Sequence, residues 1–128
     1  MASITPPFFA AAAAAQNIDC SDTGNLPQQG LNYCAMQDFE AEDRALNAAW
    51  KSVYGELKVR DADLGEAVRG MPEAMLKAQR AWITFRDAHC DTERLKYSGG
   101  SIEPLIYNSC RAALTRDRTK QINSLLAE

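Results

Sequence analysis

Basic charge is scarce in this chain of 128 residues, which carries 14 Lys and Arg against 17 Asp and Glu. A mildly acidic protein has no electrostatic attraction to nucleic-acid phosphates or anionic lipid, so the composition disfavours nucleic-acid binding and suits a basic protein partner. Long apolar runs are missing too. The apolar stretch at the N-terminus is shorter than the roughly 20 residues a transmembrane helix needs, so we expect no stable membrane insertion.

Histidine is nearly absent, and no two of the four cysteines form a CxxC pair. His89, the only histidine, adjoins Cys90, where we expect it at the surface near a helix end. These spacings disfavour zinc, and we expect neither a metal nor another cofactor. An even number of cysteines in a small chain instead favours two disulfides and an oxidising compartment. Four free thiols in a cytosolic protein are the alternative.

Residues 1–15 read MASITPPFFAAAAAA, which is apolar, rich in alanine and without a Lys or Arg near Met1. The last three alanines have the small-x-small form that signal peptidase accepts. We therefore predict a signal-peptide remnant or a disordered tail over 1–15, with an expression scar as another interpretation. Residues 16–128 are predicted to form one domain, periplasmic or secreted.

No strand-like alternation of useful length occurs, so we predict an all-α fold: a small three-helix domain, an antiparallel hairpin with an irregular N-terminal arm over 16–30. Helical spacing of apolar residues indicates a first helix over 31–59, followed by a loop over 61–70. Pro72 opens a second predicted helix that continues to Tyr97. Gly99 and Gly100 end it, and Pro104 opens the third.

The cysteines fit this hairpin in one way. If the second and third helices run antiparallel about Gly100, Cys90 and Cys110 lie at the same height. Cys20 then pairs with Cys34 and pins the arm to the first helix. Four cysteines allow three connectivities, and all three remain open at this point.

The same reasoning places charged and aromatic side chains level with one another. Asp43 falls near the height of Arg86, and Trp82 is level with both Trp50 and Arg118. We predict a partly buried Asp43–Arg86 or Asp43–Arg118 pair beside a layer of two tryptophans. Glu40 and Glu42 are expected on a solvated face, so Asp43→Ala should lower the melting temperature more than Glu42→Ala.

Several ordered motifs resemble one known family. They are Cys34 followed by E-D-R-A-L-N at 42–47, A-Q-R-A-W-I at 78–83, F-R-D at 85–87 with Cys90, G-G-S at 99–101, Cys110, and Thr115-x-x-Arg118. Together they resemble the LprI-type lysozyme-inhibitor domain over residues 20–126. The resemblance implies an exported helical domain, with lysozyme inhibition reported for some members. The motif residues are expected to form a structural polar core: Asp43, Asn47, Gln79, Trp82, Arg86 and Arg118.

The sequence disfavours an enzyme, and we assign no catalytic residue. An oxidised Cys90 cannot act as a nucleophile, and a solvated helix face explains Glu40 and Glu42 better than a glycosidase carboxylate pair does. For an inhibitor, the turn 97–103 is the candidate contact because it protrudes and carries small and hydroxyl residues. Its predicted partner-binding residues are Tyr97, Ser98, Ser101 and Glu103. A helix cap without a partner is the alternative for this turn. A cell-envelope interaction or immunity module with no lysozyme target is the alternative for the protein.

Overall fold

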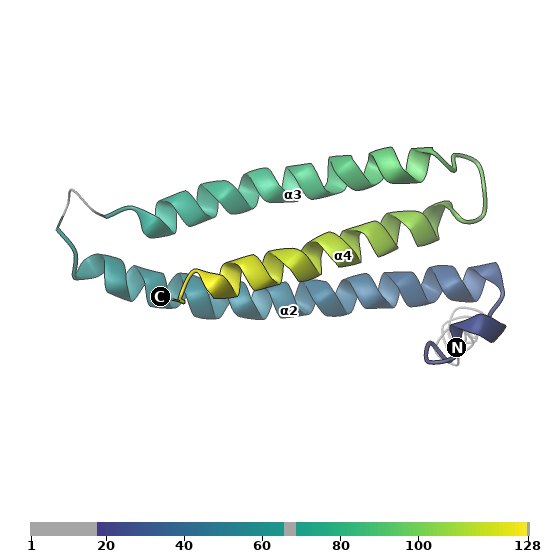
Figure 1. Ribbon diagram of the computed structural model, residues 1–128, viewed down its shortest axis with the longest axis horizontal. Helices are drawn as coiled ribbons and strands as arrows, with labels where there is room; N and C mark the ends of the chain where they lie inside the picture. The colour runs from purple at the N-terminus through teal and green to yellow at the C-terminus, as the bar shows by residue number, and fades with distance from the viewer. Residues whose placement is uncertain (1–17, 66–68, 128) are drawn as a thin grey trace, which may run out of the picture.

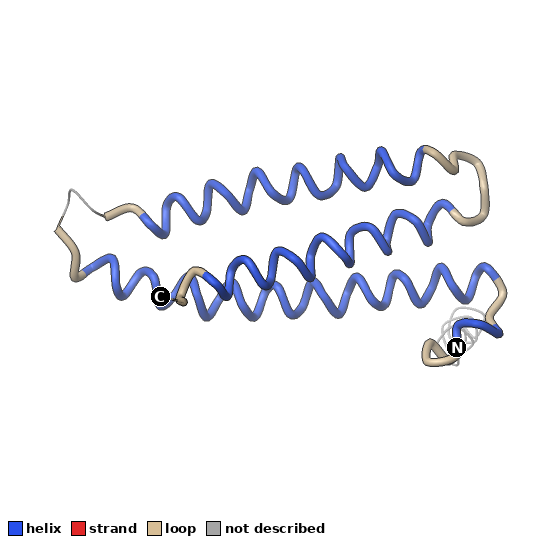
Figure 2. Tube along the Cα trace, in the orientation of Figure 1, coloured by secondary structure: helices blue, strands red, loops and turns tan. Residues whose placement is uncertain are grey.

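The computed structural model describes residues 18–65 and 69–127 (Figure 1). A short 3-10 helix, η1 (Thr23–Asn25), precedes three α-helices: α2 (Gln28–Ala62), α3 (Met71–Leu95) and α4 (Glu103–Ser124). The tube trace shows helices and connecting loops throughout the described part, with no strand (Figure 2). The predicted all-α, three-helix fold is therefore confirmed. The predicted leader over 1–15 lies outside the described residues.

The first helix begins earlier than the sequence predicted, at Gln28 rather than residue 31. Pro27 is its N-cap, with an extended backbone (φ −69°) that proline adopts readily. Gly30 was assigned to the arm but lies buried in the first turn. A Cβ there would approach the Leu26 Cβ to 3.2 Å, so the close packing of the arm against α2 favours glycine.

The connections follow the predicted glycines and prolines. Gly70 has φ +124° and Gly99 has φ +84°, a backbone region that glycine enters without steric cost. Pro72 lies in the first turn of α3, as predicted. The second helix ends at Leu95 rather than at Tyr97, because residues 96–102 already form consecutive turns.

The apolar core lies between α2 and α4, which run side by side and make the most extensive contact (Figure 1). Its members are Leu46, Val53, Leu57, Met75 and Ile122. Met75 is the only one from α3. The contact between α3 and α4 is smaller than the contact between α2 and α4, and the contact between α3 and α2 is the smallest of the three. What holds α3 in place therefore has to be sought outside the apolar core.

One of the two disulfides provides part of that hold on α3. Cys90 and Cys110 join α3 to α4 with a Cα–Cα distance of 5.6 Å, and Cys20 and Cys34 join the arm to α2 with a distance of 5.5 Å. Both predicted pairings are confirmed. Cys90 is completely buried, whereas Cys20 is exposed. Each bond is expected to stabilise the fold by roughly 2–4 kcal/mol.

Across residues 18–65 and 69–127, none of the helices combines the length and the apolar character needed to cross a membrane.

Candidate partner-binding site

Arginine and aromatic side chains alternate along the seam between α3 and the other two helices. The guanidinium of Arg86 lies 5.1 Å from the ring centroid of Trp82 and 5.2 Å from that of Phe39. Arg111 is 3.8 Å from Phe39 on α2 and 4.3 Å from Tyr107 on α4. Two further arginines flank these contacts. The resulting arginine–aromatic column is Arg118, Trp82, Arg86, Phe39, Arg111, Tyr107 and Arg94.

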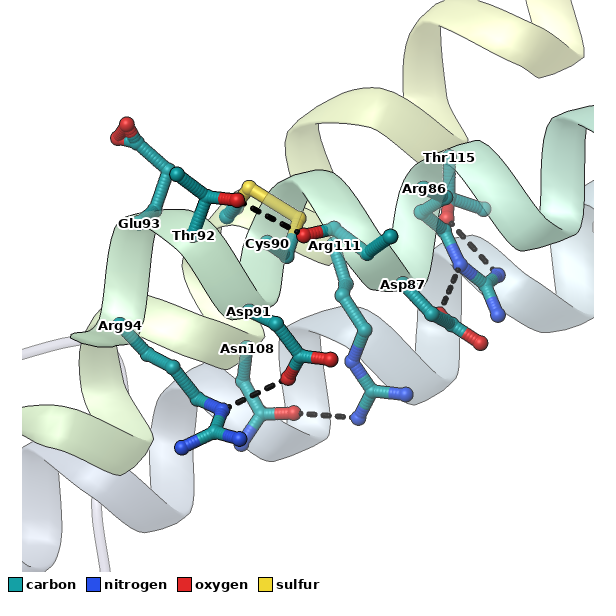
Figure 3. The surroundings of a disulfide bond; sticks show 12 residues. Arg86, Asp87, Cys90, Asp91, Thr92, Glu93, Arg94, Asn108, Arg111 and Thr115 are labelled. Atoms are coloured by element: carbon teal, nitrogen blue, oxygen red, sulfur yellow. Dashed lines mark hydrogen bonds and ion pairs between the residues drawn. A yellow bond between two sulfur atoms is a disulfide. The ribbon is translucent and has the colours of Figure 1, made fainter.

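Neighbouring polar side chains accept hydrogen bonds from the arginines of this column (Figure 3). Arg86 is 8% exposed, and its Nε donates a hydrogen bond of 2.9 Å to Asp87. Its Nη1 lies 3.9 Å from Asp43 and 3.5 Å from the Thr115 hydroxyl. Because cation–π contacts strengthen when the charge is shielded from water, the buried Arg86 is the member that stabilises the seam most.

At one end of the column, Arg118 Nε donates to Gln79 Oε1 at 2.8 Å. Burial lowers the pKa of Arg118, although a guanidinium stays protonated at any ordinary pH. At the other end, Arg94 binds Asp91 and Glu103. Hydrogen bonds from Arg94 to these two carboxylates raise its pKa, first through Asp91. The column is thus anchored at both ends by oxygen acceptors.

The structure places most of the predicted polar core in this seam. Gln79 and Arg86 are buried, while Asp43, Trp82 and Arg118 are half-buried. Asn47 was placed there wrongly. It follows the buried Leu46, so its side chain is turned about 100° around α2 and is exposed.

The two tryptophans do not form the simple layer that was predicted. Trp50 stacks on Tyr54 at a centroid distance of 5.1 Å, while Trp82 contacts the arginines. Both rings pack against the apolar core.

Glu42 corrects another sequence-based expectation. It is not on a solvated face: its carboxylate lies 2.8 Å from Arg116 on α4, with 22% of the side chain exposed. The predicted, partly buried Asp43–Arg86 pair is present at 3.9 Å, but it is longer than the Glu42–Arg116 pair and Asp43 is 41% exposed. The cause is the phase of the helix, because α4 packs against the side of α2 that carries residues 38 and 42.

Four members of the column were not predicted as site residues: Phe39, Arg94, Tyr107 and Arg111. A signal for Arg111 was present, since Arg111, Thr115, Arg118 and Ile122 share one helical stripe. Arginines on a stripe normally indicate a solvated face, which is why the pattern was not recognised.

The predicted contact turn, residues 97–103, covers most of the connection between α3 and α4, residues 96–102, and the first residue of α4. Tyr97 is 46% exposed, and Ser98 and Ser101 are exposed as well. Glu103 was predicted to contact a partner, but its carboxylate is already bound within the protein. It accepts a hydrogen bond of 2.6 Å from Arg94 and one of 3.4 Å from the Gly99 N–H, so it holds the turn in shape.

The turn is also tied to the arm end of α2, because Asn32 Nδ2 donates to the Ser101 carbonyl at 2.9 Å. Close by, a cleft of about 540 Å³ opens between the arm, α2 and α4. Its walls include Thr23, Leu31, Ala35, Asp38, Leu105 and Ser109. The turn, the cleft and the exposed disulfide therefore share one end of the bundle, here called the disulfide end (residues 18–38 and 96–109).

Charge is distributed unevenly with respect to this end. Residues 18–43 carry six acidic side chains and no Lys, Arg or His: Asp19, Asp22, Asp38, Glu40, Glu42 and Asp43. Hydrogen bonds from the hydroxyl and N–H of Ser21 keep the pKa of Asp19 below its usual value. Asp19 therefore carries its charge at neutral pH, and both Asp19 and Asp22 are exposed on the arm.

These features define a small, disulfide-stapled three-helix protein with a polar seam between its helices. The chain belongs to the LprI lysozyme inhibitor family, whose model, "Lysozyme inhibitor LprI", matches residues 20–122. An uncharacterized protein of Rhizobium meliloti (strain 1021), R02472, is 40% identical over 104 residues, covering 79% of this chain and 75% of the relative. No solved structure gives a significant match.

Proposed function

We propose that this protein is exported and inhibits a lysozyme or related peptidoglycan hydrolase by direct protein–protein contact through the disulfide end. The family match over residues 20–122 is the observation that carries the proposal, because it spans both disulfides and nearly all of the described fold. Two disulfides in a chain of this size support export to an oxidising compartment. The inhibitor acts as a binding protein and not as an enzyme.

The disulfide end is favoured as the contact surface for two reasons. First, it is rigid: the 20–34 disulfide, the Asn32–Ser101 hydrogen bond and the Arg94–Glu103 ion pair fix its shape. A preorganised surface loses little conformational entropy on binding. Second, it presents Tyr97, and exposed tyrosines are frequent anchors in protein interfaces.

Charge complementarity supports the same end. Asp19 and Asp22 are exposed on the arm, next to the cleft. Many lysozymes are strongly basic, so these carboxylates would accelerate encounter and suppress wrong orientations more than they would add affinity. Ser98 and Ser101 supply hydroxyls that could donate hydrogen bonds to the catalytic carboxyl groups of a lysozyme.

The test is inhibition of peptidoglycan lysis by purified, oxidised protein, measured against a panel of lysozymes and lytic transglycosylases. The proposal expects saturable inhibition of at least one enzyme. Tyr97→Ala should raise the inhibition constant by about tenfold or more, with circular dichroism confirming an intact fold. Asp19→Asn/Asp22→Asn should mainly slow association and reduce its dependence on salt.

Asp63→Asn is the matched control, because Asp63 is an exposed carboxylate at the opposite end of α2. It should leave inhibition unchanged. Absence of inhibition at high molar excess across the panel contradicts the proposal. If the protein captures a different envelope protein from an extract and no hydrolase, that result also contradicts the proposal. It would favour the alternative of a cell-envelope interaction module.

A further inference from the structure

A second apolar face runs along α3, away from the core. Its members recur at alternating spacings of four and three residues and are all exposed: Ala74, Ala78, Ala81, Phe85, Ala88, Thr92 and Leu95. Phe85 and Leu95 are each 54% exposed. This heptad spacing is typical of a helix that pairs with another along a straight seam. We call these residues the outer seam.

The outer seam is distinct from the side of α3 that faces the bundle. The buried residues of α3 include Met75, Gln79, Arg86 and Cys90, which follow their own helical stripe about a third of a turn away. Ile83 is 42% exposed and lies at the edge of the bundle-facing stripe, four residues after Gln79 and three before Arg86, on the side of α3 away from the outer seam. The helix α3 therefore has two separate faces whose spacing suits packing against another helix. Only one of them packs against α2 and α4.

We propose that the outer seam is a homodimer interface, in which α3 of one copy packs antiparallel against α3 of a second copy about a twofold axis between Phe85 and Ala88. This geometry matches large residues with small ones. Leu95 lies opposite Ala74 and Ala78 of the second copy, and Phe85 lies near Ala88. Small residues at the facing positions let two helices approach closely, and a twofold axis repeats each favourable contact.

Charges beside the seam select the antiparallel orientation. Lys77 and Arg80 are exposed on the edge of the seam in the first half of α3. Asp91 occupies the same edge in the second half, with its side chain 45% exposed. An antiparallel pair brings Asp91 of each copy toward Lys77 and Arg80 of the other. A parallel pair would instead set Lys77 against Lys77, which costs free energy.

An apolar groove extends the same surface. It has a volume of about 280 Å³ and opens between the first turns of α3 and the ends of the other two helices. Ala74 and Ala78 form one wall, and Met71 and Leu125, each 42% exposed, lie along it. In the antiparallel pair this groove lies near Leu95 of the second copy, so the dimer would cover the apolar surface at both ends of the seam.

The experiment is sedimentation equilibrium of the full chain over a wide concentration range, with Phe85→Glu and the control Ile83→Glu. We expect a monomer–dimer equilibrium, weakened at least about tenfold by Phe85→Glu and unchanged by Ile83→Glu. A protein that stays monomeric, or equal effects of the two variants, overturns the proposal. Loss of hydrolase inhibition in Phe85→Glu without any wild-type dimer would overturn it too, and would assign the face to the enzyme.

Cysteine trapping tests the orientation. In a mixture of Ala78→Cys and Leu95→Cys proteins, an antiparallel pair gives disulfides that join the two different variants. A parallel pair gives links between identical variants, which contradicts the proposal. Ile83→Cys serves as the control and should give no link. Peptide mapping under non-reducing conditions identifies the joined residues and verifies that both native disulfides are intact.

Discussion

The contact between α2 and α4 and the seam that holds α3 are built from different chemistry. Apolar side chains such as Val53, Leu57 and Ile122 are almost completely buried where α2 meets α4. The α3 seam relies on guanidinium groups between aromatic rings and on the buried Cys90–Cys110 bond. The contact between α2 and α4 therefore owes more to apolar burial, although Arg111–Phe39 and Arg116–Glu42 also join these two helices. The contact of α3 owes more to polar groups that depend on one another, although Met75 reaches the apolar core.

The difference matters because the two interfaces should respond differently to the same perturbation. Stabilisation by apolar burial scales roughly with the apolar area removed from water and does not depend on one particular charged partner or on reductant. A seam of charges and a covalent bond depends on each partner being present, since a buried charge that loses its partner destabilises the fold. Substitutions in each interface therefore test whether the two respond differently.

The largest effect is expected from the apolar interface. Leu57 is 1% exposed, so Leu57→Ala should reduce the free energy of unfolding by about 2–5 kcal/mol through lost burial and the cavity left behind. Urea denaturation measures the change. Val59→Ala is the control, since Val59 is 63% exposed on the same helix, and comparable losses for the two variants would contradict the assigned core.

Removal of the buried disulfide should come next. Cys90→Ala/Cys110→Ala is expected to cost about 3 kcal/mol and to raise amide hydrogen exchange in α3 more than in α2. In wild-type protein, reductant should open Cys20–Cys34 first, because Cys20 is exposed while Cys90 is fully buried. Mass spectrometry of alkylated samples follows the order, and earlier reduction of Cys90–Cys110 would contradict the contrast.

Arg86 tests the polar seam directly. Arg86→Met should cost about 2 kcal/mol, since it removes two ring contacts and leaves Asp43 and Asp87 without their cation. Partial exposure of both carboxylates limits the loss. Arg86→Lys should recover little of it because a lysine lacks the planar group that stacks on Trp82 and Phe39. Arg80→Met, at an exposed site on α3, is the control in thermal denaturation, and a loss equal to that of Arg86→Met would count against the seam.

The smallest effect concerns the acidic pair on α2. Glu42→Gln should destabilise by about 0.5 kcal/mol, and Asp43→Asn by less, because Glu42 has the shorter ion pair and the less exposed side chain. This order reverses the one that helical spacing alone predicted. A greater loss for Asp43→Asn in matched thermal melts would restore the original interpretation.

Much of the fold could be predicted because apolar spacing, glycines and prolines encode it locally. The Cys90–Cys110 pairing followed from the hairpin, and Gly99 with Pro104 marked the turn. The arginine–aromatic column could not be predicted in the same way, because an arginine such as Arg111 reads as a surface residue until three helices enclose it. Glu42 was misplaced because α2 faces two neighbours and has more than one buried side. Asn47 was misplaced in the opposite sense, because it lies one residue beyond the buried Leu46 and points to solvent.

The central claim, that the disulfide end binds a peptidoglycan hydrolase, is tested most directly by hydrogen exchange of the protein with and without a saturating inhibited enzyme. The account predicts slower exchange in residues 96–102 and in the arm up to Asp38, with little change at the opposite end around residues 56–65. Protection centred on residues 56–65, with the turn and the arm unaffected, would contradict it.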